Sequence, residues 1–372
     1  MSTIKSLTLT AFRNYQSAVM NNIDSPFVIL VGDNGAGKTN CLEALSLLSP
    51  GRGLRGARVL DIQSQTDKNP WAVSAQIRDN DGDITRLGVG RDPQRPDKKI
   101  IRADGTTLKN QNELGDILRT IWLTPQMDGL FMQGVSDRLR FFDRLVATYD
   151  AAHVGRLTRY EKATRQRLNI LRDDTQIPDT VWLSALENIM AETSVAIAAG
   201  RVDMLGYLLE SINSGDNANF PQSKITLKGD VENALNAQSA LYVEDMVREK
   251  LQSMRNADGQ TGRTNFGVGR TDMQVTYLDK NADAAQCSTG EQKALLTSII
   301  LAHARMVAAR FGAPPLLLFD EVTAHFDAKR RDALFEVLND LGGQIWMSGQ
   351  DEYAFEAIAN KRMLNVENNQ LL

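Results

Sequence analysis

The chain has 372 residues, 42% of them hydrophobic and 24% charged, with a formal net charge of −4. This composition is ordinary for a globular protein of two domains, or of one large domain with an insertion, and it excludes a disordered chain. Because the net charge is negative, any nucleic-acid site must be a local basic patch.

The sequence also bounds the cell compartment. Its first residues lack a signal-peptide core, and no uninterrupted apolar run approaches the about 18 residues of a membrane span. The two cysteines, Cys41 and Cys287, form neither a disulfide framework nor a metal cluster. Both lie beside nucleotide motifs, but small buried side chains are the simpler interpretation. We therefore expect a cytoplasmic protein with no membrane partner.

The first 125 residues combine short strand patterns with one helical pattern. Residues 4–9 partly alternate in polarity, residues 27–31 form an apolar run, and residues 40–48 have helical periodicity. Further strands surround turn signals rich in Asp and Gly, at residues 71–77, 84–89 and 99–102. These strands predict a small antiparallel sheet beside the helix.

The rest of the chain is first mainly helical and then alternates again. Helices are expected at residues 136–148, 153–171, 181–212 and 240–254, with a lone strand at 224–227. Beyond residue 271 we expect strands at residues 273–278, 314–319, 344–347 and 363–366, and helices at 291–310, 329–341 and 352–359. The predicted fold class is α/β, with a discontinuous head at residues 1–125 and 260–372 and an inserted, mainly helical domain at residues 126–259.

A phosphate-binding loop follows the apolar run at residues 27–31. Its pattern, G-x-x-x-x-G-K-T, comprises Gly32, Asp33, Asn34, Gly35, Ala36, Gly37, Lys38 and Thr39. The glycines let successive N–H groups point at phosphate oxygens, Lys38 reaches the β- and γ-phosphates, and the Thr39 hydroxyl is placed for Mg²⁺. A strand before the loop and a helix after it disfavour the alternative, a chance glycine-rich turn.

An acidic motif completes the pattern of a nucleoside triphosphatase. The apolar residues 316–319 end in Asp320 and Glu321, and a strand buried on both faces places such acids at the edge where α/β sheets bind ligands. Asp320 would hold Mg²⁺, and Glu321 would act as general base on the attacking water. Alone, the motif is also compatible with a strand that ends at an acidic turn. Thr39 and Asp320 lie 281 residues apart, which suggests an ABC-type ATPase with a large insertion.

Residues 287–293, C-S-T-G-E-Q-K, are similar to the ABC signature motif. Ser288 and Glu291 have the spacing of a capping box, and an ordinary helix cap is the alternative interpretation. Gly290 permits close backbone approach, and a Ser288 hydroxyl at a positive helix end suits a γ-phosphate. The resemblance implies that this motif completes the ATP site of a second subunit in a head-to-tail dimer.

Together the motifs resemble the RecF family, relatives of the SMC proteins. The resemblance rests on residues 7–15, on N-G-x-G-K-T-N followed by Glu43-Ala44, on residues 51–55 and on residues 137–145. It implies nucleotide contacts at Arg13, Asn14, Asn40, Gln126 and Asp327, with Gln126 also sensing Mg²⁺ or the attacking water. For Arg13, a surface arginine after a strand is the alternative.

Two departures from the family pattern bear on the rate of hydrolysis. Gly269 stands where the family usually has histidine, within G-V-G-R-T-D, while Arg270 and Asp272 match. Ser348-Gly349-Gln350 occupies the switch region, where many ABC ATPases carry histidine. We therefore expect a slow timer or clamp rather than a fast motor.

A basic stretch runs from residue 136 to residue 172, with nine Lys or Arg against four Asp or Glu. This local excess predicts a surface for the nucleic-acid backbone, without sequence-specific recognition, because no aromatic stacking platform or recognition motif accompanies it. Solvated helix faces with internal ion pairs are the alternative. The candidate DNA-binding residues are Arg138, Arg140, Arg144, Arg156 and Arg159.

The resulting hypothesis is an ATP- and Mg²⁺-dependent, DNA-stimulated ATPase that dimerises on single-strand gaps or junctions during repair. The family resemblance implies that it helps RecO and RecR load RecA. Two alternatives stay open, a DNA scaffold that binds ATP with negligible hydrolysis and the ATPase subunit of another system, such as a transporter. The catalytic residues would be Lys38, Glu321 and, from the partner, Ser288.

Overall fold

The computed structural model describes residues 2–173, 179–215, 220–324, 326–367 and 370–371. The chain divides into two compact units, each built from segments distant in sequence. Unit 1 comprises Met1–Gly129, Ser214–Gln222 and Ser288–Leu372, and unit 2 comprises Leu130–Asn213 and Ser223–Cys287.

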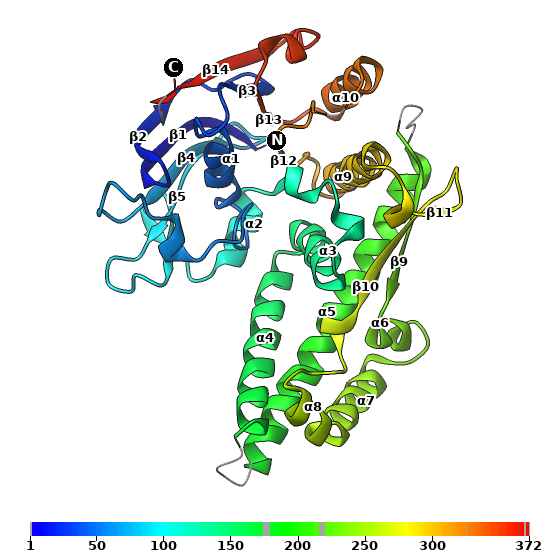
Figure 1. Ribbon diagram of the computed structural model, residues 1–372. Coiled ribbons are helices and arrows are strands. Elements are labelled where there is room, and N and C mark those ends of the chain that lie inside the picture. The colour runs from blue at the N-terminus through cyan, green and yellow to red at the C-terminus, as the bar shows by residue number, and fades with distance from the viewer. Residues whose placement is uncertain (1, 174–178, 216–219, 325, 368–369, 372) are drawn as a thin grey trace. The chain divides into compact units, whose positions relative to one another are not determined.

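Unit 1 contains two six-stranded sheets with helices packed on them (Figure 1). The antiparallel sheet has the order β2-β1-β4-β5-β6-β7, formed by β1 (Thr3–Phe12), β2 (Tyr15–Met20), β4 (Ala72–Arg78), β5 (Ile84–Arg91), β6 (Lys99–Ala103) and β7 (Thr106–Thr107). The second sheet has the order β15-β14-β3-β13-β12-β8, formed by β3 (Phe27–Val31), β8 (Thr120–Leu123), β12 (Leu316–Phe319), β13 (Ile345–Gly349), β14 (Lys361–Glu367) and β15 (Gln370–Leu371). Its ladders are parallel except between β14 and β15.

One buried apolar cluster joins both sheets of unit 1 through helix α1. Leu42 and Leu45 of α1 pack in the same cluster as Leu9 of the antiparallel sheet and Val28 and Leu318 of the parallel sheet. The helices of unit 1 are α1 (Lys38–Ser46), α2 (Leu114–Ile117), α9 (Thr289–Phe311) and α10 (Ala328–Leu341). By length and composition, α9 alone among the described helices could cross a membrane, but 72% of its apolar window is buried in the protein, which is typical of a core helix.

Unit 2 is mainly helical, with one small sheet. Its helices are α3 (Val135–Tyr149), α4 (Ala152–Leu171), α5 (Thr180–Ser214), α6 (Asp230–Leu235), α7 (Ala240–Ser253) and α8 (Arg255–Thr261). A three-stranded antiparallel sheet has the order β11-β10-β9, from β9 (Ser223–Lys228), β10 (Asp272–Tyr277) and β11 (Ala282–Asp283). The α/β class predicted from the sequence is therefore confirmed, with a mainly helical unit inserted in the chain.

Three sequence expectations differ from the structure. The strand at residues 224–227 is not alone, because β9 pairs with β10 over six residue pairs. That pairing also places residues 260–287 in unit 2, whereas the sequence analysis assigned them to the head. The helix expected at residues 352–359 is only a 3₁₀ turn, Glu352–Phe355, because so short a segment cannot offset the cost of starting a helix. The half-buried strand β2 and the buried strand β8 were not predicted.

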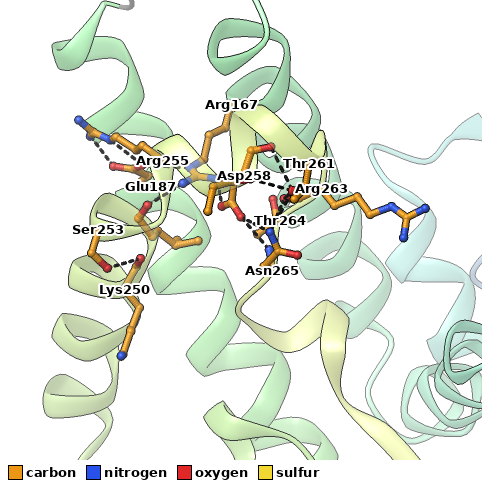
Figure 2. A network of polar contacts seen from close by, with 12 residues as sticks. Arg167, Glu187, Lys250, Ser253, Arg255, Asp258, Thr261, Arg263, Thr264 and Asn265 are labelled. Atoms are coloured by element: carbon orange, nitrogen blue, oxygen red, sulfur yellow. Dashed lines mark hydrogen bonds and ion pairs between the residues drawn. The ribbon is translucent and has the colours of Figure 1, made fainter.

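A buried ionic network holds the helices of unit 2 together (Figure 2). Arg167 of α4 donates to Glu187 of α5 at 3.0 Å and to Asp258 of α8 at 2.7 Å, and all three side chains are fully buried. Arg255 also donates to Glu187, at 2.5 Å, and the Asn265 amide donates to Asp258 at 2.9 Å. Each carboxylate therefore has at least two donors, as a buried charge requires.

We expect Arg167→Ala to destabilise unit 2 by about 3–5 kcal/mol, because two buried carboxylates lose their shared cation. The matched control is Arg159→Ala, which breaks an exposed α4–α5 pair with Glu192 and should cost about 0–1 kcal/mol. Hydrogen exchange of the α4, α5 and α8 amides measures both. Equal protection in the two variants would contradict a stabilising role for the network.

Candidate functional site

The parallel sheet brings three chain segments to one edge. In register, Met347 of β13 pairs with Ile29 of β3 on one side and with Phe319 of β12 on the other. Gly32 follows β3 and Asp320 follows β12, so both leave the sheet at the same carboxyl edge, where Ser348 lies near the end of β13. This is the edge at which open α/β sheets bind ligands.

The glycine-rich loop turns directly into α1, and Gly37 lies at the turn. Its φ of 118° lies in the region that favours glycine, and a Cβ there would come within 2.7 Å of the Tyr15 hydroxyl and 2.8 Å of the Asn14 amide. Tyr15 donates to the Gly37 carbonyl at 3.0 Å, and Asn40 of α1 donates to the Asn14 side-chain oxygen. The β1–β2 turn thus supports the back of the phosphate-binding loop.

Lys38 folds over the same loop. Its ammonium is almost buried and donates to the carbonyl of Asp33 at 2.8 Å and to that of Gly32. Burial lowers the pKa of Lys38, while the nearby charges of Glu321 and Asp320 act in the opposite direction. A cation held against loop carbonyls is poised to exchange them for phosphate oxygens.

Thr39 and Asp320 meet at the centre of the site. The Thr39 hydroxyl lies 2.9 Å and 3.0 Å from the two carboxylate oxygens of Asp320, which is buried. A hydroxyl and a carboxylate are oxygen donors of the kind that Mg²⁺ prefers, usually with phosphates and waters completing its shell. Among the described residues no group of three or more His, Cys, Asp or Glu could form a separate metal site. The residues present fit Mg²⁺.

Cavities adjoin the phosphate-binding loop, and two of them bear on nucleotide binding. One, of about 530 Å³, is lined by Asp33, Asn34 and Glu367 among others. The other, of about 680 Å³, is lined by Arg13, Asn14, Asn40 and residues 63–66. The second has the size of a small-molecule pocket and lies beside Asn14, which contacts the loop.

Glu43 is a buried carboxylate of α1 for which no role was predicted from the sequence. Arg13 donates to both of its oxygens, at 2.9 Å and 2.5 Å, and Arg55 donates to it at 2.6 Å. Arg13 also has a φ of 53°, which is uncommon outside glycine. An acid inside the otherwise apolar run Leu42–Leu45 was the available signal, since such a residue is rarely buried without a partner.

Glu321 is held by groups whose role was likewise not predicted. It has a φ of 50°, its N–H donates to the Ser348 hydroxyl at 3.0 Å, and Lys293 lies 3.4 Å from its carbonyl. Lys293 is buried in α9, and its ammonium also donates to the Ala324 carbonyl at 2.8 Å and lies 3.5 Å from Asp128. Burial lowers the pKa of Lys293. These bonds fix the loop that follows β12.

The remaining predicted nucleotide residues of unit 1 have local roles in this structure. Ser288 and Glu291 form the predicted capping box at the start of α9, and Gly290 is half-buried. Asp327 caps α10 by accepting from the Arg330 N–H at 2.8 Å. Gln126 lies exposed in a 3₁₀ turn just after β8, and Asn34 accepts from Gln350 at 2.9 Å.

The five candidate DNA-binding arginines lie in unit 2, and four of them bond carboxylates there. Arg138 donates to Asp272 at 2.8 Å, Arg159 donates to Glu192 at 2.9 Å and 3.1 Å, Arg140 pairs with Asp137, and Arg156 pairs with Asp150. Arg144 is half-buried against the Phe141 ring. Much of the positive charge counted in the sequence is therefore already paired.

Comparison with known proteins decides the family. Residues 3–370 match the RecF/RecN/SMC N-terminal domain family. The DNA replication and repair protein RecF of Rhizobium rhizogenes is 42% identical over 360 residues, covering 96% of this chain and 95% of its own length. The chain belongs to the RecF family. RecF of Brucella suis is 40% identical over 372 residues, covering 99% of this chain and 95% of its own.

Solved structures agree in fold with this RecF-family chain. A structure described as the recombination mediator RecF with ATP in the RecFOR pathway has a TM-score of 0.85 at 20% identity, covering all of this chain and 97% of its own. The Smc head domain of Pyrococcus furiosus has a TM-score of 0.54 at 14% identity, and the match covers 100% of this chain and 95% of that one. The predicted fold, an ABC-type head with an antiparallel sheet and a helical insertion, is thus confirmed.

We expect Lys293→Met to loosen the segment at residues 320–324 by about 1–3 kcal/mol, because the partly buried Ala324 carbonyl and the Asp128 carboxylate lose a charged donor. Local hydrogen exchange measures the loss. Lys329→Met, an exposed lysine of α10, is the control and should leave the exchange of this loop unchanged. Normal protection in Lys293→Met would show that the ammonium does not hold the loop.

Proposed function

We propose that this chain is a DNA-binding ATPase of replication and repair, in which ATP closes two copies head to tail on DNA and slow hydrolysis releases them. The contact between Thr39 and Asp320 carries the proposal, because it unites the two halves of a nucleotide-hydrolysing site across 281 residues. The names of the RecF relatives and the ATP in a solved RecF structure support it.

In this proposal the nucleotide is bound by the loop and by the β1–β2 turn. The loop N–H groups and Lys38 hold the phosphates, and the 680 Å³ pocket beside Arg13 and Asn14 takes the nucleoside. The full set of proposed nucleotide residues is Arg13, Asn14, Gly32, Asp33, Asn34, Gly35, Ala36, Gly37, Lys38, Thr39, Asn40, Gln126, Gly290 and Asp327.

Hydrolysis would use residues that the structure already orients. Thr39 and Asp320 would hold Mg²⁺, together with Gln126, which follows β8 just as Asp320 follows the neighbouring strand β12. When bound, Mg²⁺ neutralises charge that develops on the phosphates. Glu321 would accept the proton of the attacking water, and Lys38 would stabilise the transferred phosphoryl group.

Dimerisation would complete this site. Ser288 is exposed and Gly290 is half-buried at the start of α9, where helix N–H groups and a hydroxyl would be available to an anion. Ser288 bonds Glu291 of its own helix rather than the phosphate-binding loop, which suits a group that serves the second copy.

We further propose that DNA is bound through the backbone at Arg138, Arg140, Arg144, Arg156 and Arg159, without sequence specificity. Four of these arginines would have to exchange a carboxylate partner for a phosphate. DNA binding is therefore weaker than it would be if all nine Lys and Arg at residues 136–172 were free. The expected substrate is a single-strand gap or a junction, in the cytoplasm. The RecFOR pathway named for the solved relative supports RecO and RecR as partners in loading RecA.

A scaffold that binds ATP with negligible hydrolysis is the second candidate. The observation in its favour is Ser348 at the switch position, because serine cannot supply the charge or acid–base chemistry of histidine.

We expect Glu321→Gln to lower ATP turnover by at least about 100-fold and to keep ATP binding, because only the general base is removed. ATP-bound dimers should then accumulate on DNA, as measured by light scattering together with DNA-stimulated hydrolysis. Glu336→Gln, an exposed glutamate of α10, is the control and should behave as wild type. If neither wild type nor Glu321→Gln dimerises with ATP, the head-to-tail proposal fails.

DNA affinity should fall steeply as the salt concentration rises. On duplex DNA, the plot of log K against log salt should become less steep by about 0.9 for each phosphate contact that a variant removes. The double variant Arg140→Ala/Arg159→Ala removes two exposed cations of the candidate surface and should flatten the slope. Arg248→Ala, which breaks a pair with Glu244 elsewhere in unit 2, is the control. A slope equal to that of wild type would exclude these two arginines from the DNA interface.

A further inference from the structure

Ser348 lies where the two halves of the nucleotide site are joined. It is the fourth residue of β13, the strand between β3, which leads into the phosphate-binding loop, and β12, which leads into Asp320. Its partner across the ladder is Leu30 of β3, and the preceding residue, Met347, pairs with Phe319 of β12. Ser348 is therefore level with Asp320, and it is completely buried.

The Ser348 hydroxyl uses both of its hydrogen-bonding functions on catalytic neighbours. It donates to Oδ1 of Asp320 at 2.6 Å and accepts from the backbone N–H of Glu321 at 3.0 Å. A serine hydroxyl has one donor, so its proton is committed to Asp320.

The bond to Asp320 restricts the rotation of its carboxylate group. The terminal torsion of an aspartate is broad, so the direction of its oxygens is set by their partners. Ser348 and Thr39 both approach Oδ1, whereas among the bonds described here Oδ2 receives only Thr39, at 2.9 Å. The Ser348 hydroxyl thus fixes the rotation of the Asp320 carboxylate together with Thr39.

The bond to Glu321 addresses backbone strain. A φ of 50° is unfavourable for a residue with a side chain and persists only where the surroundings hold it. The Ser348 hydroxyl anchors the N–H of that residue, and Lys293 and Ala324 bond or approach its carbonyl.

We propose that Ser348 is a positioning residue that sets the Asp320 carboxylate for Mg²⁺ and the Glu321 backbone for the attacking water with a single hydroxyl. The inference rests on the proposed function, since it requires Asp320 to be a Mg²⁺ ligand. In this role Ser348, which stands where many ABC ATPases carry histidine, orients Asp320 and Glu321 and does not itself bind phosphate.

The test compares the affinity of the full chain for ATPγS with Mg²⁺ and with EDTA, and the ratio of the two measures how strongly Mg²⁺ and nucleotide binding are coupled. Ser348→Ala should reduce this ratio about 10- to 100-fold, as loss of a partner behind a metal ligand does, with affinity in EDTA unchanged. The Glu321 amide should also exchange faster with solvent. Should Ser348→Ala fold poorly, Ser348→Cys has nearly the same size and only a weak donor, and it should shift the ratio in the same direction.

Ser46→Ala is the matched control. Ser46 is also fully buried in unit 1, and its hydroxyl likewise donates once, to the Glu43 carbonyl at 2.6 Å, and accepts once, from the Leu54 N–H at 2.7 Å. It should leave the Mg²⁺ ratio unchanged, which separates the loss of any buried hydroxyl from the loss of this one.

Asp320→Asn separates the two levels of the proposal. If wild type shows no Mg²⁺ effect, or if Asp320→Asn leaves the ratio intact, the proposed metal site itself fails. If Asp320→Asn abolishes the ratio while Ser348→Ala and Ser348→Cys keep it within threefold of wild type, the metal site stands and the role of Ser348 is overturned.

Discussion

Everything at the nucleotide site depends on the parallel register of β3, β13 and β12. Parallel strands end at a common edge, so residue 32 meets residues 320 and 348 there although it lies far from both in the chain. The antiparallel sheet contributes from the other side, through the turn at Arg13 and Asn14 that supports the phosphate-binding loop. Helix α1 packs against both sheets, and Glu43 on it ties Arg13 and Arg55 to the same helix that begins with Lys38 and Thr39.

The parts of this site that have a fixed spacing were predictable from the sequence. Glycine and lysine positions in the loop, four apolar residues before Asp320, and the S-x-x-E spacing at Ser288 each reflect a local geometric need, and the structure contains each of these local features. What could not be predicted is contact between side chains that no spacing links, such as Ser348 with Asp320 or Lys293 with the loop after Glu321. The strand β8 was also missed, because four buried residues carry too little periodicity to identify a strand.

Charge counting along unit 2 illustrates a second limit. The stretch from residue 136 to residue 172 is basic by composition, yet Arg167 serves a buried network and Arg138 bonds Asp272, which lies 134 residues further along the chain. Asp143, an acid in the same stretch, likewise has a partner distant in sequence, Arg201. Burial disfavours the charge of Asp143, but the Arg201 guanidinium holds the pKa of that carboxyl below its usual range. Arg201 in turn donates to Glu232. A cation whose partner is distant in sequence looks free until the fold is known.

The division of unit 1 into three chain segments bears on how the protein is made. Unit 2 lies almost wholly between residues 130 and 287, so all of its helices leave the ribosome before β12, β13 and β14 exist. The strand that leads into the phosphate-binding loop, β3, must therefore wait until both of its parallel neighbours, β13 and β14, have been translated. During synthesis the helical insertion is therefore complete before the strands that flank β3 exist, and the edge that carries the phosphate-binding loop is assembled after it.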